Sequence, residues 1–248
     1  MNCVVCGNFT KQIKIDTYEC NLCGHIFRDF RGDSIKFHKE IYRSKDHKNS
    51  KRDLKEINSD GNITNFFHKA RKTIVESRLS VIKPFLNNKK NCFDIGSGAG
   101  TFVNELREQT NIEDIECLEL ADNLVKESRR LGFTTHQKSF LEFSTDRVFD
   151  LVTCYHVLEH VKDLDLFITR LNKIAKDMVV FEVPTLYCNF GKTNKKRNWR
   201  PPNDGSYDGH HHYFTIKSLT KLFEKHYRIV SIESGTQAPA ILLIGVKK

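Results

Sequence analysis

The stretch Phe93–Thr101, which reads FDIGSGAGT, decides the fold. Glycines at positions 96, 98 and 100 follow a short apolar run and precede a predicted helix. Glycine lets a chain turn sharply from strand to helix, and without a Cβ its backbone N–H can approach a ligand closely. Glu119 stands 25 positions after Asp94, at the end of the next apolar run, where a carboxylate can bind both hydroxyls of a ribose. The pattern predicts a nucleotide-binding loop and its ribose partner.

The glycine spacing narrows the kind of nucleotide. Dinucleotide-binding folds carry G-x-G-x-x-G, whereas this loop is G-x-G-x-G preceded by aspartate. It resembles the first motif of class I S-adenosylmethionine-dependent methyltransferases. The run FDLVTCYHVLEHV at 149–161 is similar to the fourth motif of that family. With YECNLCGHIF, EVPT and HHYFTIKSLTKLFEK, the resemblance extends over nearly the whole chain, to methyltransferases with an N-terminal zinc ribbon, many of which act on sugars or other small metabolites.

The resemblance implies a cofactor, S-adenosylmethionine, which leaves as S-adenosylhomocysteine, and a set of residues that bind it. Asp94 orders the loop, Glu119 binds ribose, and Ser139 stands where relatives often carry an acidic residue facing adenine. A hydroxyl or the backbone would then contact adenine, beside an apolar wall. The full implied set is Asp94, Gly96, Ser97, Gly98, Gly100, Glu119, Leu120, Ser139, Phe140 and Tyr155.

Strand-like and helix-like segments alternate after residue 90, which is typical of an α/β fold with a parallel sheet covered on both faces. Strands are expected at Cys92–Ile95, Ile115–Leu120, Thr134–Lys138, Asp150–Tyr155, Met178–Val183, Arg228–Ser234 and Ala240–Val246. Helices are expected at Thr101–Glu108, Ala121–Leu131, Leu164–Ile174 and Ile216–His226. Seven strands, the last two joined by a turn at Gly235, predict the Rossmann-like methyltransferase sheet.

Two C-x-x-C knuckles, Cys3 with Cys6 and Cys20 with Cys23, precede this fold. Each knuckle aims two thiolates at one point, so four sulfurs can surround a structural Zn²⁺ with no open coordination position. A pair of disulfides is the alternative, which the lack of an export signal disfavours. The sequence predicts a zinc ribbon.

Composition divides the chain into three segments. We expect the zinc ribbon at 1–32, a charged linker at 33–61 with one short helix at Ser34–Arg43, and the methyltransferase domain at 62–248 with a substrate lid at about 185–213. An amphipathic helix should end near Pro84. The sequence has no long apolar stretch and no signal peptide, so a cytoplasmic protein without a membrane span is expected.

Two histidine-rich runs could supply acid–base chemistry. His210 is the first candidate for the catalytic base, followed by His156 and His212, because an imidazole titrates near neutrality. Glu159 and His160 are candidates for substrate binding, or could merely cap and pair locally. Three adjacent histidines on an extended chain point in opposite directions, which argues against one metal ion bound by all three.

Charge suggests the substrate class. The net charge of +9 arises before residue 91, where 19 Lys/Arg face 10 Asp/Glu. Residues 191–202 hold five cations, among them Arg197 and Arg200, which could bind an anionic substrate such as a phosphorylated or nucleotide-linked sugar. Solvated basic surfaces are the alternative. The expected activity is O- or C-methylation of a small anionic metabolite; a nucleic-acid methyltransferase or a non-catalytic zinc-ribbon interaction protein are the alternatives.

Overall fold

The computed structural model describes residues 1–29, 66–185, 188–189, 196–197, 209–234 and 240–248. The chain forms two compact units, which we call the terminal unit (Met1–Ser34 with Cys154–Lys248) and the central unit (Ile35–Thr153). Each is described by itself. Among the described residues, no helix combines the length and the apolar character needed to span a membrane.

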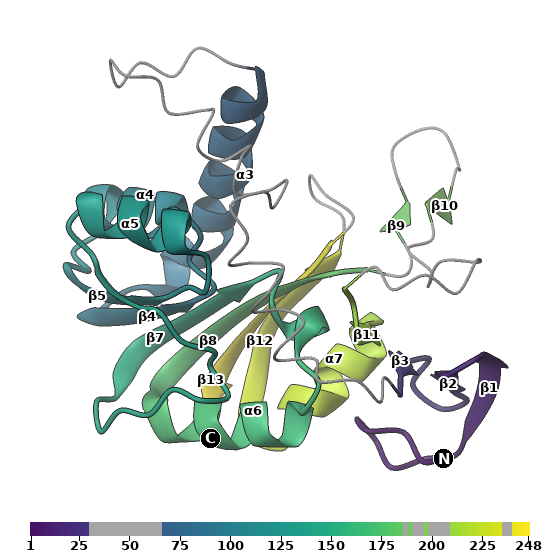
Figure 1. Ribbon diagram of the computed structural model, residues 1–248. Coiled ribbons are helices and arrows are strands. Elements are labelled where there is room, and N and C mark those ends of the chain that lie inside the picture. The colour runs from purple at the N-terminus through teal and green to yellow at the C-terminus, as the bar shows by residue number, and fades with distance from the viewer. Residues whose placement is uncertain (30–65, 186–187, 190–195, 198–208, 235–239) are drawn as a thin grey trace. The chain divides into compact units, whose positions relative to one another are not determined.

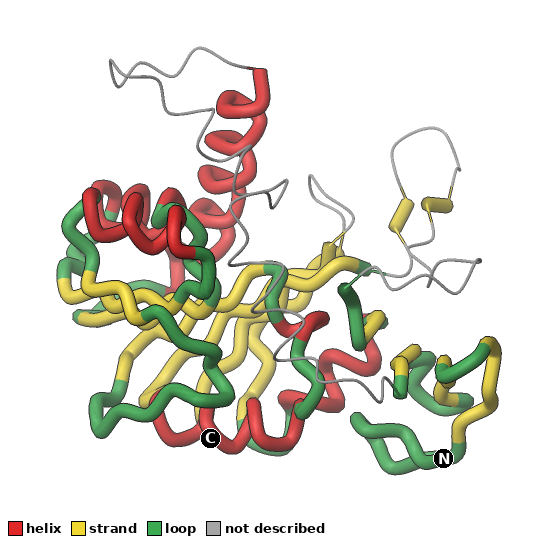
Figure 2. Tube along the Cα trace, viewed as in Figure 1, coloured by secondary structure: helices red, strands yellow, loops and turns green. Residues whose placement is uncertain are grey.

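The central unit contains the parallel strands β4 (Asn91–Ile95), β5 (Asp114–Leu118) and β6 (Thr134–His136). Helix α4 (Thr101–Gln109) connects β4 to β5, and α5 (Asp122–Arg130) connects β5 to β6 (Figures 1 and 2). Buried apolar side chains fill one side of each helix, as the 3.6-residue period requires. Helix α3 (Phe66–Ile82) ends in a 3₁₀ turn at Lys83–Phe85, close to the predicted end at Pro84.

The terminal unit contains an antiparallel arrangement of β8 (Ala175–Pro184), β13 (Ala240–Lys247) and β12 (Tyr227–Ser234). Helix α6 (Leu164–Ile174) begins where the Asp163 carboxylate accepts the Leu166 N–H. Helix α7 (Ile216–Phe223) begins with a capping box between Thr215 and Ser218.

Strand β7 (Phe149–Tyr155) completes a seven-stranded sheet with the order β12-β13-β8-β7-β4-β5-β6. All seven predicted strands are present within three residues of their expected bounds. The sheet is mixed, because β13 pairs in the antiparallel direction with both neighbours. The predicted α/β methyltransferase fold is therefore confirmed, with four predicted helices at α4 to α7.

Three N-terminal strands and one later strand form a small second sheet, in the order β1-β2-β3-β11. Strands β1 (Thr10–Lys14), β2 (Thr17–Cys20) and β3 (Ile26–Arg28) follow each other along the chain. The fourth strand, β11 (His212–Tyr213), belongs to the second segment of the terminal unit, Cys154–Lys248, and pairs with β3 (Figure 1). Sequence analysis did not foresee that the histidine run would extend the cysteine-bearing sheet.

Several expectations fall outside the described residues: the linker 33–61 with its helix Ser34–Arg43, the turn at Gly235, and most of the lid at 185–213. Within the lid, the structure describes the pairing of β9 (Cys188–Asn189) with β10 (Lys196–Arg197). The domain bounds 1–32, 33–61 and 62–248 stay predictions.

Candidate functional site

The glycine loop adopts the backbone that its residue types allow. Gly96, Gly98 and Gly100 have φ values of 76°, 57° and 85°, in the left-handed region that glycine favours. A Cβ at Gly100 would lie 3.3 Å from both the Phe133 ring and the Ser128 hydroxyl, and the φ of 85° would strain any other residue there. A Cβ at Gly98 would meet nothing within 4 Å. The middle of the loop therefore presents bare backbone beside open space, as a ligand cradle requires.

Glu119 lies directly against this loop. Its Oε2 accepts the Gly98 N–H at 2.9 Å, while Oε1 accepts the N–H groups of Leu120 at 2.6 Å and Ala121 at 2.9 Å. The Gly96 N–H donates to the Leu118 carbonyl oxygen at 2.7 Å, which fastens the loop to the end of β5. The loop and its predicted ribose partner thus meet within the central unit.

Asp94, at the start of the loop, is 2% exposed and accepts a hydrogen bond from the Thr153 hydroxyl at 2.6 Å. Burial raises the pKa of Asp94 to about 7, although the Thr153 hydrogen bond and the Arg78 charge oppose the shift. The side chain is held inside the core by β4 and β7, at the start of the loop.

The remaining predicted cofactor residues of the central unit flank β5 and β6. The Ser139 carbonyl oxygen accepts the N–H groups of Glu142 and Phe143, which forms a tight turn after β6. Phe140 is buried, with its ring 6.5 Å from that of Phe93. Ser97 and Leu120 are half-buried. Tyr155 ends β7 in the terminal unit, where its side chain is 9% exposed.

A second group of polar side chains lies in the terminal unit, after β7. His156 has a φ of 57°, a strained value for a residue with a Cβ. Its Nε2 lies 2.9 Å from Glu182 Oε1 and its Nδ1 lies 3.5 Å from Glu159 Oε1. Burial by itself lowers the pKa of His156, but the two carboxylates outweigh it and raise the pKa to about 9. His156 is therefore a proton-bearing donor at neutral pH.

Glu159 and His160, in the 3₁₀ turn η2 (Leu158–His160), meet His210. The Glu159 side chain is 3% exposed, and its pKa is lowered because the nearby histidines outweigh the effect of burial. His160 Nε2 lies 3.8 Å from Glu159 Oε1, and the rings of His160 and His210 are 4.7 Å apart. The His211 N–H donates to the Glu159 carbonyl oxygen at 2.8 Å. Four predicted site residues, His156, Glu159, His160 and His210, are thus brought together.

His212 lies elsewhere, among buried rings of the cysteine-bearing sheet. It is 4% exposed, and its Nδ1 lies 3.1 Å from Nε2 of His25, which is fully buried. Phe214 packs against both rings. His212 therefore lies outside the group formed by Glu159, His160 and His210. Sequence reasoning assigned no role to His25 or to Glu182, although Glu182 stands in the quoted EVPT run.

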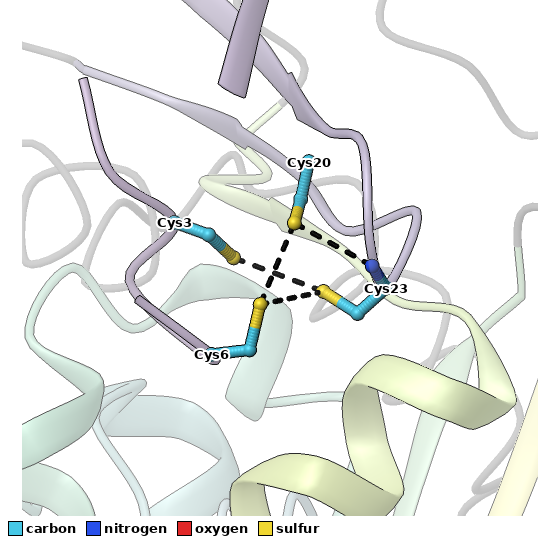
Figure 3. A group of neighbouring side chains, drawn as sticks. All are labelled: Cys3, Cys6, Cys20 and Cys23. Atoms are coloured by element: carbon cyan, nitrogen blue, oxygen red, sulfur yellow. Dashed lines mark hydrogen bonds between the residues drawn. The ribbon is translucent and has the colours of Figure 1, made fainter. Parts of the chain in front are cut away.

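The four N-terminal cysteines converge on one point (Figure 3). Sulfur–sulfur distances are 3.8 Å for Cys3 with Cys23 and 3.5 Å for Cys6 with both Cys20 and Cys23. Four sulfurs at about 2.3 Å from a tetrahedral Zn²⁺ lie about 3.8 Å from each other. The cluster therefore has the donor set and the dimensions of a structural zinc site. None of the seven cysteines whose side chains the structure describes forms a disulfide.

The profile of the methyltransferase-domain family matches residues 66–226, which is more than half of the chain. The chain belongs to this methyltransferase family. The prediction of an S-adenosylmethionine-dependent methyltransferase is confirmed at this level. No curated protein sequence matches the chain.

Several solved structures share the fold. The magnesium protoporphyrin IX methyltransferase of Synechocystis PCC 6803, with bound S-adenosylhomocysteine, is 16% identical over 87% of this chain and 100% of its own, with a TM-score of 0.62. The N-methyltransferase NodS of Bradyrhizobium japonicum WM9, bound to the same product, is 16% identical over 87% and 99%, with a TM-score of 0.54. DesVI of Streptomyces venezuelae is 17% identical over 73% and 95%, with a TM-score of 0.55.

The buried Asp94 predicts how the stability of this methyltransferase depends on pH. Between about pH 4 and about pH 7 the folded state keeps a proton that the unfolded state has lost, so the free energy of unfolding falls as pH rises through this window. In Asp94→Asn this contribution is absent, and the variant gains stability relative to wild type toward neutral pH. Denaturant unfolding of cofactor-free protein at about pH 5 and about pH 8 measures the difference. The exposed Asp146→Asn is the control. If the free energy of unfolding changed equally with pH in wild type and Asp94→Asn, the raised pKa of Asp94 would be contradicted.

Proposed function

We propose that this methyltransferase transfers the methyl group of S-adenosylmethionine to a small anionic metabolite that carries a hydroxyl group. The acceptor class is a phosphorylated or nucleotide-linked sugar, or a similar compound of glycan or natural-product biosynthesis. The observation that carries the cofactor assignment is the Glu119 carboxylate seated on the Gly98 N–H of the glycine loop. The four clustered thiols need a reducing environment, which supports a cytoplasmic location.

The cofactor side would be supplied by the central unit. Bare backbone at Gly98 can approach the aminoacyl part, and the Glu119 carboxylate can accept hydrogen bonds from ribose hydroxyls. Ser139 and Phe140, which follow β6, stand on the adenine side of this assignment. Bound cofactor supplies an electrophilic methyl group; the chain itself binds and orients it.

The acceptor side would be supplied by the terminal unit. His156, which carries a proton at neutral pH, can donate to an anionic acceptor, and His210 can take the proton of the attacking hydroxyl. Methyl transfer is an in-line displacement, so holding the nucleophile about 3 Å from the methyl carbon accounts for much of the rate. Arg197 and Arg200 belong to the proposed lid at about 185–213, where cations would bind the phosphate groups.

We assign the cysteine cluster to a structural zinc ion. Four thiolates saturate a tetrahedral ion, which leaves no position for a substrate. The metal would hold β1 to β3, which have too few buried apolar residues to form a core of their own.

The cofactor assignment predicts the effect of Glu119→Ala. Losing hydrogen bonds between a carboxylate and ribose costs about 1.5–3 kcal/mol, so affinity for S-adenosylmethionine should fall roughly 10- to 100-fold. Isothermal titration calorimetry with the full chain measures this. Glu113, which is exposed and directly precedes β5, provides the control. Glu113→Ala should bind S-adenosylmethionine as tightly as wild type does. Unchanged affinity in Glu119→Ala, or no binding by wild type, would overturn the assignment.

The acceptor assignment predicts a charge requirement. With radiolabelled S-adenosylmethionine, phosphorylated or nucleotide-linked sugars should be methylated, while the matching uncharged sugars should react at least about 10-fold more slowly at equal concentration. Arg197→Gln and Arg200→Gln should raise KM and leave kcat close to wild type. Methylation of uncharged sugars at the same rate, or of RNA or DNA in preference to sugars, would show that the acceptor class is wrong.

A further inference from the structure

Two proton-accepting atoms face each other in the histidine cluster of the terminal unit. His160 Nδ1 lies 2.8 Å from the carbonyl oxygen of Gly209, which can only accept, so Nδ1 carries the proton. In the neutral imidazole Nε2 then presents its lone pair, and it lies 3.8 Å from Glu159 Oε1. That distance is too long for a hydrogen bond. A lone pair and a carboxylate oxygen at this separation have the arrangement of two ligands of one cation.

The distance between His160 and Glu159 suits a metal ion. Two ligand atoms about 2.1 Å from an ion lie about 3.0 Å apart at a right angle and about 4.2 Å apart on opposite sides. The 3.8 Å between His160 and Glu159 falls in this range. His210 adds a third ligand atom, and all three atoms lie within 4.8 Å of one another. Two imidazole nitrogens and one carboxylate oxygen form the donor set.

A second observation concerns the other oxygen of the same carboxylate. Glu159 Oε2 is fully buried and has no hydrogen-bond partner among the described residues. An unsatisfied buried carboxylate oxygen is costly, because it has lost water without gaining a donor. A cation bound by both oxygens of the Glu159 carboxylate would satisfy it.

The surroundings hold the three residues in place. The hydrogen bond from His160 Nδ1 to the Gly209 carbonyl fixes the ring orientation, an outer-shell contact typical of metal-bound histidines. A Cβ at Gly209 would lie 3.6 Å from the His160 ring, so the backbone packs closely there. Of the three adjacent histidines, only His210 belongs to the cluster, because His212 packs against His25 beside β3.

We propose that Glu159, His160 and His210 bind one divalent transition-metal cation, whose open coordination positions take oxygen atoms of the methyl acceptor. The role in acceptor binding rests on the proposed function. In this form of the mechanism His210 gives its lone pair to the cation rather than to a proton, and the cation lowers the pKa of the coordinated hydroxyl, which then releases its proton to solvent water before the oxygen attacks the methyl group. Three protein ligands leave neighbouring positions open, which suits an acceptor with two adjacent oxygen atoms, such as a hydroxyl beside a second hydroxyl or a phosphate.

The test is a Mn²⁺ titration of the zinc-loaded full chain, followed by electron paramagnetic resonance. The four thiolates of the cysteine cluster select soft ions, so Mn²⁺ reports on the second site. We expect one Mn²⁺ per chain. Glu159→Gln and His210→Ala should weaken binding at least about 10-fold. The control variant His226→Ala, which removes an exposed histidine, should bind Mn²⁺ as tightly as wild type does.

Pulsed resonance spectra of wild type with bound Mn²⁺ keep the test independent of how the variants fold. Couplings to two imidazole nitrogens support the site; no bound Mn²⁺, or bound Mn²⁺ without these couplings, overturns it. Calorimetry with S-adenosylmethionine on the same zinc-loaded protein without Mn²⁺ separates the two proposals. Cofactor binding without any Mn²⁺ site leaves the proposed function intact, whereas absence of cofactor binding contradicts the proposed function whatever the metal result.

Discussion

The pairing of β3 with β11 is the interaction on which the terminal unit depends. It joins the cysteine-bearing sheet to the histidine run, with His212 opposite Phe27 and Tyr213 opposite Ile26. The Arg28 N–H donates to the His211 carbonyl oxygen, and the Thr215 hydroxyl donates to the Cys23 carbonyl oxygen. These contacts leave β11 little freedom. The His211 N–H also donates to the main-chain carbonyl oxygen of Glu159. The position of β11 therefore determines where His210 meets the Glu159 carboxylate.

A carboxylate organises each half of the chemistry. In the central unit Glu119 accepts three backbone N–H groups and so ties the glycine loop to the end of β5. In the terminal unit the buried Glu159 carries a negative charge, because three neighbouring histidines lower its pKa. The first carboxylate is held by backbone hydrogen bonds, in the position that we propose for ribose binding. The other concentrates negative charge at a place where a proton or a cation must balance it.

Sequence patterns predicted what depends on local chemistry. Periodic apolar runs gave the seven strands and the helices α4 to α7, and the glycine spacing gave the loop. The two C-x-x-C knuckles predicted a four-sulfur cluster. In each case neighbouring residues carry the whole signal.

The rest depends on contacts between distant parts of the chain. Strand β11 has only two residues, and the sequence HHYF does not distinguish a strand from a loop. Its strand character arises from its pairing with β3. The contact of His25 with His212 and the meeting of Glu159 with His210 arise from this same pairing. The sequence named both His210 and His212 as candidates for the base, whereas in the structure His210 lies in a polar cluster with Glu159 and His160, and His212 packs against His25.

We infer that the cysteine site holds the histidine segment in place through β3. Hydrogen–deuterium exchange on Cys6→Ser tests it most directly, because this change disrupts the thiolate site and leaves Glu159, His160 and His210 intact. Amides at 26–28 and 210–214 should exchange faster than in wild type, while those at 93–119 should not change. Val4→Ser, at an exposed position in the same knuckle, should behave as wild type does. Unchanged protection of 210–214 in Cys6→Ser would contradict the account.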